Sequence, residues 1–464
     1  MANVFDYVKR ETRQLTDPDA PFNEVDALVF ASLAYEDVAR ISPTLSLADD
    51  KAVSFAARLR AFRPRHPWMW VKGLVDEPFP SMTLVEANDA LHRGDDVARE
   101  PSADDAQEPE SAGTDRRADG AATHDVEMVG LADPEETHAF FRAVAESPRF
   151  AATRLGAVVE HVNPGEQTQF AAMTFRLPDG RGWNGRPLAS RATRTQDGEP
   201  RHGWPHRNVD PTRGGTLVIA FRGTDDSLIG WKEDFNMSFQ YPVPAQRAAS
   251  AYLDMVARLW KGDIVLTGHS KGGNLAVYAA MNADEEVRRR IRHVYSLDGP
   301  GFPPNVVTSR QYLATQPMVT KIVPSSSIVG QIFETPEPCR VVASDSDGIM
   351  QHFTFSWQVE GDHFVAEPDL ASSSQLFNES LNAWMRDLTV EQRERAVDAL
   401  FAVLHANGAT TFSEVIAGFP GSIPAMVASM FGLSAQDRRH LLEATAILVK
   451  AAMARGPRGP RSGR

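Results

Sequence analysis

Short runs of consecutive apolar residues alternate with stretches of helical spacing over the second half of the chain. Such runs are typical of strands that are buried on both faces. We expect strands at 216–222, 263–267, 293–297, 319–323 and 339–343. In 245–260 and 273–282 the apolar residues recur every three or four positions, as on one face of a helix. Strands that alternate with helices predict an α/β fold around a mostly parallel central sheet.

Further elements are expected before this alternation begins. Asn23 is placed to cap a helix, because its side chain can accept hydrogen bonds from the first turn. The apolar face of that helix holds Val25, Leu28, Val29 and Leu33. A second helix is expected near residue 139, followed by a strand pair at 155–160 and 170–177. These elements predict an N-terminal helical and strand extension of the sheet.

Composition divides the chain into parts. Between Glu86 and Glu136 there are sixteen acidic residues and four arginines, a composition typical of a disordered insertion. After Glu367 the spacing becomes helical, and amphipathic helices at 390–406 and 438–453 are expected to pack on the core. The predicted parts are 1–87 (N-terminal part of the main domain), 88–137 (acidic insertion), 138–385 (core, with an irregular insertion at 178–215), 386–454 (helical region) and 455–464 (disordered basic tail).

Composition and charge exclude several classes of protein. The chain has 464 residues, 42% of them hydrophobic, which suits a globular fold with a sizeable core. Cys339 is the single cysteine, so neither a disulfide framework nor a zinc-ribbon or iron–sulfur centre is expected. The net charge of −13 lies almost wholly in the acidic insertion, and the rest of the chain has no basic face for nucleic acid.

The ends and the hydropathy of the chain bear on its location. The N-terminal residues carry charges where a signal peptide needs an apolar run. No stretch reaches the ~18 uninterrupted apolar residues of a membrane span. We therefore expect a cytoplasmic protein without a transmembrane segment, while its oligomeric state stays open.

The strongest chemical signal is the sequence Gly-His-Ser-Lys-Gly at residues 268–272. It follows a predicted strand directly and opens a predicted helix, which is the context that a G-x-S-x-G nucleophile turn requires. The two glycines let neighbouring backbone approach, so that Ser270 can occupy a strained turn with its hydroxyl exposed. The backbone N–H of Lys271, at the start of the helix, is then placed to bind an oxyanion.

A nucleophilic serine needs a base and an acid that orients the base. In the expected chain order the acid follows the serine and the histidine comes last. Asp298 ends the strand after Ser270, at the same edge of the sheet, although an Asp that starts a Gly/Pro turn is common too. His352 and His363 both follow the last predicted strand, and spacing does not choose between them. His269 is expected to point away from the nucleophile and to serve packing.

A second oxyanion donor is expected from the loop after the strand at 216–222. Thr224 lies in that loop and offers an N–H and a hydroxyl, although the segment also fits a turn followed by a helix cap. Trp231 and Asp234 are expected to hold the loop in place by packing and a hydrogen bond, and Arg222 is assigned a structural role.

Several of these motifs resemble those of known lipase-related proteins. Residues 221–224, Trp231 with Asp234, and 268–276 resemble the class 3 (fungal-type) lipases of the α/β-hydrolase fold. More closely, the chain resembles the Mbeg1-like family, a lipase-related bacterial family known by a domain-of-unknown-function label. This second resemblance rests on the motifs at 22–27, 169–174, 223–225, 231–235, 296–301, 325–330 and 351–357, and it covers most of residues 1–385.

The resemblance implies roles for individual residues. Ser270 would be the nucleophile, Lys271 and Thr224 the oxyanion donors, and His352 rather than His363 the base. In class 3 lipases the acid is expected after the strand that corresponds to 321–324, where this chain has serines at 325–327. Asp298, one strand earlier, resembles instead the acid position of pancreatic-type lipases. The Lys271 side chain stands where lipases often have an apolar residue, and it is expected to be a surface or supporting charge.

The sequence therefore predicts a serine hydrolase that cleaves carboxylic ester or thioester bonds of a small-molecule or lipid acyl substrate. No cofactor and no metal are needed for this chemistry. One alternative is a catalytically impaired hydrolase fold that acts as a binding or regulatory module, because no Asp follows Val323. A weaker one is acyl transfer. The first two differ in whether Asp298 and His352 lie within hydrogen-bond reach of each other and of Ser270.

Overall fold

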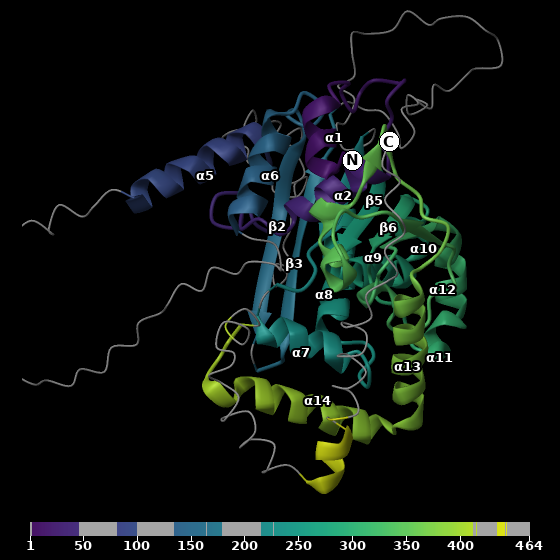
Figure 1. The fold of residues 1–464 in the computed structure, drawn as a ribbon. Coiled ribbons are helices and arrows are strands. Elements are labelled where there is room, and N and C mark those ends of the chain that lie inside the picture. Colours follow the sequence, from purple (N-terminus) through teal and green to yellow (C-terminus); the bar gives the residue numbers. More distant parts are fainter. Residues whose placement is uncertain are drawn as a thin grey trace, which may run out of the picture.

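A central sheet of eight strands runs through the computed structural model (Figure 1). The structure describes residues 2–45, 81–99, 134–163, 165–178, 215–225, 227–411, 414, 434–440 and 442. The strands lie side by side in chain order. They are β1 (Ser81–Thr83), β2 (Arg154–Asn163), β3 (Thr168–Arg176), β4 (Thr216–Phe221), β5 (Asp263–His269), β6 (Ile291–Leu297), β7 (Val319–Pro324) and β8 (Cys339–Val342).

The sheet is mixed, with its parallel part in the second half of the chain. Strands β1 to β4 pair antiparallel, whereas β4 to β8 pair parallel. Parallel strands need crossover connections, and the helices between them supply these. The predicted α/β architecture with a largely parallel sheet is thus confirmed, and each predicted strand is present. All carboxyl ends of β4 to β8 lie at one edge, where the loops that follow them meet.

Helices cover both faces of the sheet. One face packs against α1 (Val4–Arg10), α2 (Glu24–Leu33), the start of α5 (Leu84–Arg99) and α6 (Pro134–Glu146). The other packs against α8 (Pro244–Leu259), α9 (Lys271–Asn282) and α12 (Arg310–Thr315). The shorter helices α10 (Glu285–Arg288) and α11 (Pro304–Val307) lie in the connections around β6. Two layers of helix around one sheet bury the strands on both faces, as their apolar runs predicted.

Helix α2 begins where the sequence indicates. The Asn23 side chain accepts hydrogen bonds from the backbone N–H groups of Val25 and Asp26, and the Asp26 side chain accepts one from Asn23 N. This reciprocal cap satisfies donors that a helix leaves unpaired. Every residue of α2 is buried, so the helix is held from all sides rather than along one apolar face. The expected helix is confirmed.

The range predicted for the acidic insertion contains helical residues at both of its ends. Helix α5 continues to Arg99, so residues 88–99 are helical, and α6 begins at Pro134, inside the predicted range. An acidic composition poor in apolar residues does not by itself prevent a helix. Residues 100–133 of the insertion, most of the irregular stretch 178–215 and the basic tail lie outside the described residues.

Helices α13 (Ser372–Asp387) and α14 (Val390–Leu404) follow the last strand of the sheet. In Figure 1, α14 lies below α7 (Leu228–Asn236). Leu228, Val397 and Phe401 form a small apolar cluster between them. The prediction that the helix at 390–406 packs on the core is confirmed through this contact. Most of the other predicted C-terminal helix, 438–453, lies outside the described residues. No helix in the described residues has the length and apolar character that a membrane span requires.

A buried ion pair holds the N-terminal segment to the rest of the molecule. The Arg149 guanidinium donates through Nε to Asp26 Oδ1 over 2.7 Å and through Nη2 to Asp26 Oδ2 over 2.5 Å. Both side chains are essentially inaccessible to solvent. Tyr7 Oη also donates to Asp26 Oδ1, over 2.8 Å. Removing one member of such a pair leaves an uncompensated buried charge.

Arg149→Met is therefore expected to lower the free energy of unfolding by about 3–5 kcal/mol. Urea denaturation at neutral pH measures this change. The matched control is Arg289→Ala, because Arg289 pairs with Glu285 at the surface, where both side chains are more than 70% exposed. Its expected cost is below about 0.5 kcal/mol. An equal cost for the two variants would contradict a structural role for the buried pair.

Candidate functional site

Ser270 lies in the tight turn between β5 and α9. Its backbone has φ 57° and ψ −133°, a conformation that residues other than glycine rarely adopt. The flanking glycines permit the turn, because a Cβ on Gly268 would lie 2.2 Å from the Gly272 carbonyl group and one on Gly272 would lie 2.1 Å from the Phe221 carbonyl oxygen. The strand, turn and helix that the motif predicts are all present. The turn places Ser270 at the carboxyl edge of the parallel strands.

Asp298 follows β6 at the same edge and is completely buried. Its Oδ2 lies 2.6 Å from His352 Nδ1. Its Oδ1 accepts hydrogen bonds from Ser327 Oγ over 2.5 Å and from the backbone N–H of Gly330 over 3.1 Å. These donors satisfy the carboxylate, which would otherwise be costly to bury. The serine segment at 325–327 thus contributes Ser327, which holds Asp298 in place.

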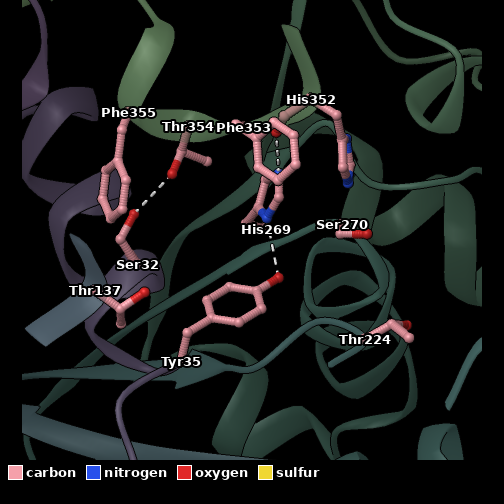
Figure 2. A pocket seen from close by; sticks show the side chains of 10 residues that line it. All are labelled: Ser32, Tyr35, Thr137, Thr224, His269, Ser270, His352, Phe353, Thr354 and Phe355. Carbon is pink, nitrogen blue, oxygen red and sulfur yellow. Dashed lines mark hydrogen bonds between the residues drawn. The ribbon is translucent and has the colours of Figure 1, made fainter. Parts of the chain in front are cut away.

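Ser270 and His352 line one cavity (Figure 2). The His352 ring lies above the Ser270 side chain in this view, and Thr224 lies on the same side of the cavity. Within the described part of the chain, Ser270 Oγ and His352 share no hydrogen bond. Such contacts are often long before a substrate binds. Three of the side chains singled out in the sequence therefore meet, with Asp298 behind His352.

His363, the other candidate base, lies elsewhere. It is part of β10 (His363–Phe364), which pairs with β9 (Val359–Glu360) in a separate two-stranded ribbon. Its side chain is 57% exposed, and its Nδ1 lies 3.2 Å from Asp362 Oδ1. It is not among the residues that line the cavity of Ser270. The geometry thus favours His352 over His363, a choice that spacing alone did not allow.

His269 does more than the packing expected of it. Its ring lines the same cavity as Ser270, its Nε2 lies 2.9 Å from the His352 backbone oxygen, and its Nδ1 lies 3.0 Å from Tyr35 Oη. A carbonyl oxygen only accepts, so Nε2 carries the proton and Nδ1 accepts from the tyrosine. Burial lowers the pKa of His269 well below its usual value, which keeps this neutral tautomer.

Tyr35 connects this histidine to the loop after β4. A Cβ on Gly223 would lie 2.2 Å from Tyr35 Oη, so only glycine allows this approach, and the Gly223 N–H lies against the hydroxyl. The Tyr35 side chain thereby lies between the Thr224 loop and the loop that carries His352. No local pattern in the sequence points to Tyr35, because its partners lie about 190 and 230 residues further along the chain.

The Thr224 loop is fixed by the carboxylates of α7. Thr224 Oγ1 donates to Asp234 Oδ2, so the hydroxyl is already committed and the backbone N–H is the group left for a ligand. This corrects the expectation that the hydroxyl too would be free. Burial raises the pKa of Asp234 to about 6, against the opposing charge of Lys271. The predicted bond between the loop and Asp234 is present.

The Lys271 side chain was expected to be a surface or supporting charge. The surface position is wrong, since the side chain is fully buried. Its Nζ lies 3.2 Å from Glu233 Oε2, 3.4 Å from Asp234 Oδ1 and 3.2 Å from Gln169 Oε1. Burial alone would lower the pKa of Lys271, but the two carboxylates outweigh it and raise the pKa. The charged side chain points away from the cavity and ties α9 to α7. The backbone N–H at the start of α9 is what remains for a ligand.

The described residues contain no group of three or more His, Cys, Asp or Glu side chains arranged to hold a metal ion. The polar groups that converge here are one hydroxyl, one imidazole, one carboxylate and backbone amides. Such a set can activate an oxygen nucleophile and bind a developing negative charge.

These features define an α/β protein with a serine, a histidine and an aspartate gathered at the carboxyl edge of its parallel strands. Residues 144–402, more than half of the chain, match the family model described as Mbeg1-like, so the chain belongs to this family. The resemblance of the motifs to the Mbeg1-like family is thus confirmed. No curated protein and no solved structure matches the chain. Tyr35, on the N-terminal side, lies outside the matched residues.

Proposed function

We propose that the protein is a serine hydrolase of the α/β-hydrolase type that cleaves carboxylic ester or thioester bonds through an acyl-enzyme on Ser270. The observation that supports this most is the 2.6 Å contact between His352 Nδ1 and Asp298 Oδ2, beside a strained Ser270 that faces the same cavity. An orienting acid, a base and a nucleophile at one sheet edge are what acyl transfer to a serine requires.

In the first step, His352 acts as the general base. Asp298 accepts the Nδ1–H of the imidazole, so Nε2 is free to take the proton of Ser270 Oγ. The serine oxygen attacks the acyl carbonyl carbon, and a tetrahedral intermediate forms. When the bond to the leaving oxygen or sulfur breaks, the imidazolium returns its proton to that atom. The acyl group then remains on Ser270.

The negative charge of the intermediate would be bound by two backbone amides. The N–H of Lys271 is at the open start of α9, and that of Thr224 lies in the loop after β4. Neither amide donates a backbone hydrogen bond among the residues that the structure describes. The buried contacts of Glu233 and Asp234 hold both donors in position before the substrate arrives.

In the second step, water releases the acyl group. His352 takes a proton from the water, whose oxygen attacks the acyl carbonyl carbon, and Ser270 leaves with that proton as its hydroxyl. The carboxylate of Asp298 stabilises the imidazolium in both steps. If an alcohol replaced water as the acceptor, the same residues would catalyse acyl transfer.

The proposal is tested by hydrolysis of p-nitrophenyl acetate and of a matched acetyl thioester. We expect turnover above the buffer rate, preceded by a burst of about one equivalent of product per chain, because a covalent intermediate accumulates in such enzymes. Folded protein that turns over neither substrate would contradict the proposal. That result would favour the alternative of a hydrolase fold that only binds its ligand.

Tyr35→Phe is expected to lower kcat about tenfold and to leave KM nearly unchanged. Loss of the hydroxyl leaves His269 Nδ1 without its donor, and an unpaired buried group costs about 1–3 kcal/mol, which loosens the loops of His352 and Thr224. The matched control is Tyr312→Phe, since Tyr312 Oη donates to Glu337 in another part of the molecule. Equal kcat values for the two variants would show that Tyr35 does not position the site.

A further inference from the structure

The cavity beside Ser270 is small. It has a volume of about 30 Å³. A cavity needs about 10–15 Å³ to hold one water, so the space holds roughly two or three water molecules. An acyl chain of about two to four carbons occupies a comparable space. The cavity alone would not hold a long fatty-acyl chain.

The end of the cavity opposite Ser270 is closed by side chains that are themselves held in place. Figure 2 shows Ser32, Thr137 and Phe355 on that side. The Phe355 ring packs against Phe5 at 5.1 Å and against Phe140 at 4.8 Å between centroids. Moving it outward would require these rings to be repacked, which is costly in a dense core.

A hydrogen bond joins the two walls of the cavity near this closed end. Ser32 Oγ on α2 lies 3.1 Å from Thr354 Oγ1 on the loop that follows His352. Ser32 is buried, and both hydroxyls are satisfied by this contact. The wall opposite the nucleophile is thus built from an N-terminal helix and the His352 loop together. The hydrogen bond holds these two elements together at the end of the cavity opposite Ser270.

The acyl-enzyme mechanism indicates that this space receives the acyl group of the substrate. In an acyl-enzyme mechanism the acyl group stays bonded to Ser270 between the two steps, whereas the alcohol or thiol departs after the first. A small cavity whose far end is lined by packed side chains suits the part that stays. The length of the leaving group is not limited by the wall at Phe355.

We propose, on the basis of the proposed function, that the substrate is an ester or thioester of a short acyl group of about two to four carbons. Phe355 sets the upper limit of its length. The residue is a determinant of specificity and takes no part in bond breaking. A lipid substrate with long acyl chains is therefore not the expected one.

Two series of esters test this inference on the full-length protein. In p-nitrophenyl esters of two, four, eight and twelve carbons, we expect kcat/KM to fall about 100-fold or more between four and eight carbons, since a single methylene without room in a pocket already discriminates about 10- to 200-fold. In acetate esters of ethanol, butanol and octanol, kcat/KM is expected to change less than about fivefold. Faster hydrolysis of the eight- or twelve-carbon esters would overturn the inference and leave the proposed function standing.

Phe355→Ala adds a test of the residue itself. The variant is expected to raise the ratio of kcat/KM for the eight-carbon ester to that for acetate at least about tenfold. Phe30→Ala is the control, because Phe30 lies in the same apolar core but does not line the cavity. In this variant the ratio of kcat/KM for the eight-carbon ester to that for acetate should equal the wild-type ratio. If Phe355→Ala does not fold, Phe355→Leu makes a smaller opening and is expected to raise the same ratio by a smaller factor. An unchanged ratio in a folded Phe355 variant would overturn the proposal that Phe355 limits the length of the acyl group.

Failure of this inference differs from failure of the proposed function. If no ester of either series is hydrolysed and no burst occurs, both proposals are wrong. If esters are hydrolysed with a preference for long acyl chains, only the size of the substrate is wrong.

Discussion

Ser270→Ala is expected to lower kcat for p-nitrophenyl acetate by about 10⁶-fold. The remaining rate would come from substrate binding and the backbone amides alone. The hydroxyl is the one group that forms a covalent bond to the acyl carbon in this account. The variant should fold as wild type does, because Ser270 Oγ makes no hydrogen bond among the described residues and alanine removes a single atom. The burst phase should disappear together with turnover.

Ser344→Ala is the matched control for this experiment. Ser344 Oγ lies 2.8 Å from Ser356 Oγ, and neither residue lines the cavity of Ser270. Its kcat should remain within about twofold of wild type, since Ser344 is half-buried and lies outside the cavity, and loss of one such hydrogen bond costs about 1 kcal/mol of stability rather than catalysis. If Ser270→Ala kept more than about a tenth of the wild-type kcat, the nucleophile would be another group.

Asp298→Asn is expected to lower kcat by about 10⁴-fold. An amide in this place can donate to His352 Nδ1, which moves the imidazole proton to Nε2 and leaves no base for Ser270. The other hydrogen bonds of residue 298 are kept, because the amide oxygen can still accept from Ser327 Oγ and from the Gly330 N–H. We expect KM to change little, because the acid does not contact the substrate.

The control for this variant is Asp263→Asn, the same substitution at the opposite end of β5. Asp263 pairs with Arg292 there, over 2.7 Å. Its kcat should match wild type. A folded Asp298→Asn variant with kcat within about tenfold of wild type would mean that the acid lies elsewhere or that His352 acts without one.

Much of the fold follows from local pattern. The apolar runs predicted β4 to β8, and the cap at Asn23 predicted α2, because burial on both faces and helix capping leave direct marks in sequence. Helix α1 and strand β1 were not predicted. Both are short, and they are stabilised by contacts with distant segments, as β1 is by pairing with β2. The sequence does not predict the extension of α5, because an acidic composition with few apolar residues is typical of disorder.

The candidate site was predicted in part. Ser270, Asp298 and His352 carry signals of strand end, motif and chain order, and the structure brings them to one place. Tyr35 carries none, and Ser327 lies in a family motif that does not reveal its contact with Asp298, since what both residues do depends on hydrogen bonds to residues far away in sequence. The burial of Lys271 also depends on partners that are distant in sequence. A lysine is expected at the surface unless carboxylates pair with it, and here Glu233 and Asp234 do so.

The central claim, an activated serine at position 270, is tested most directly by labelling the pure full-length protein with a fluorophosphonate probe. Such a probe reacts with a serine whose proton a neighbouring base removes. We predict that one probe molecule is bound per chain, that peptide mapping finds it on Ser270, and that Ser270→Ala abolishes the label. Folded wild-type protein that stays unlabelled, or a label that persists in Ser270→Ala, would contradict the account.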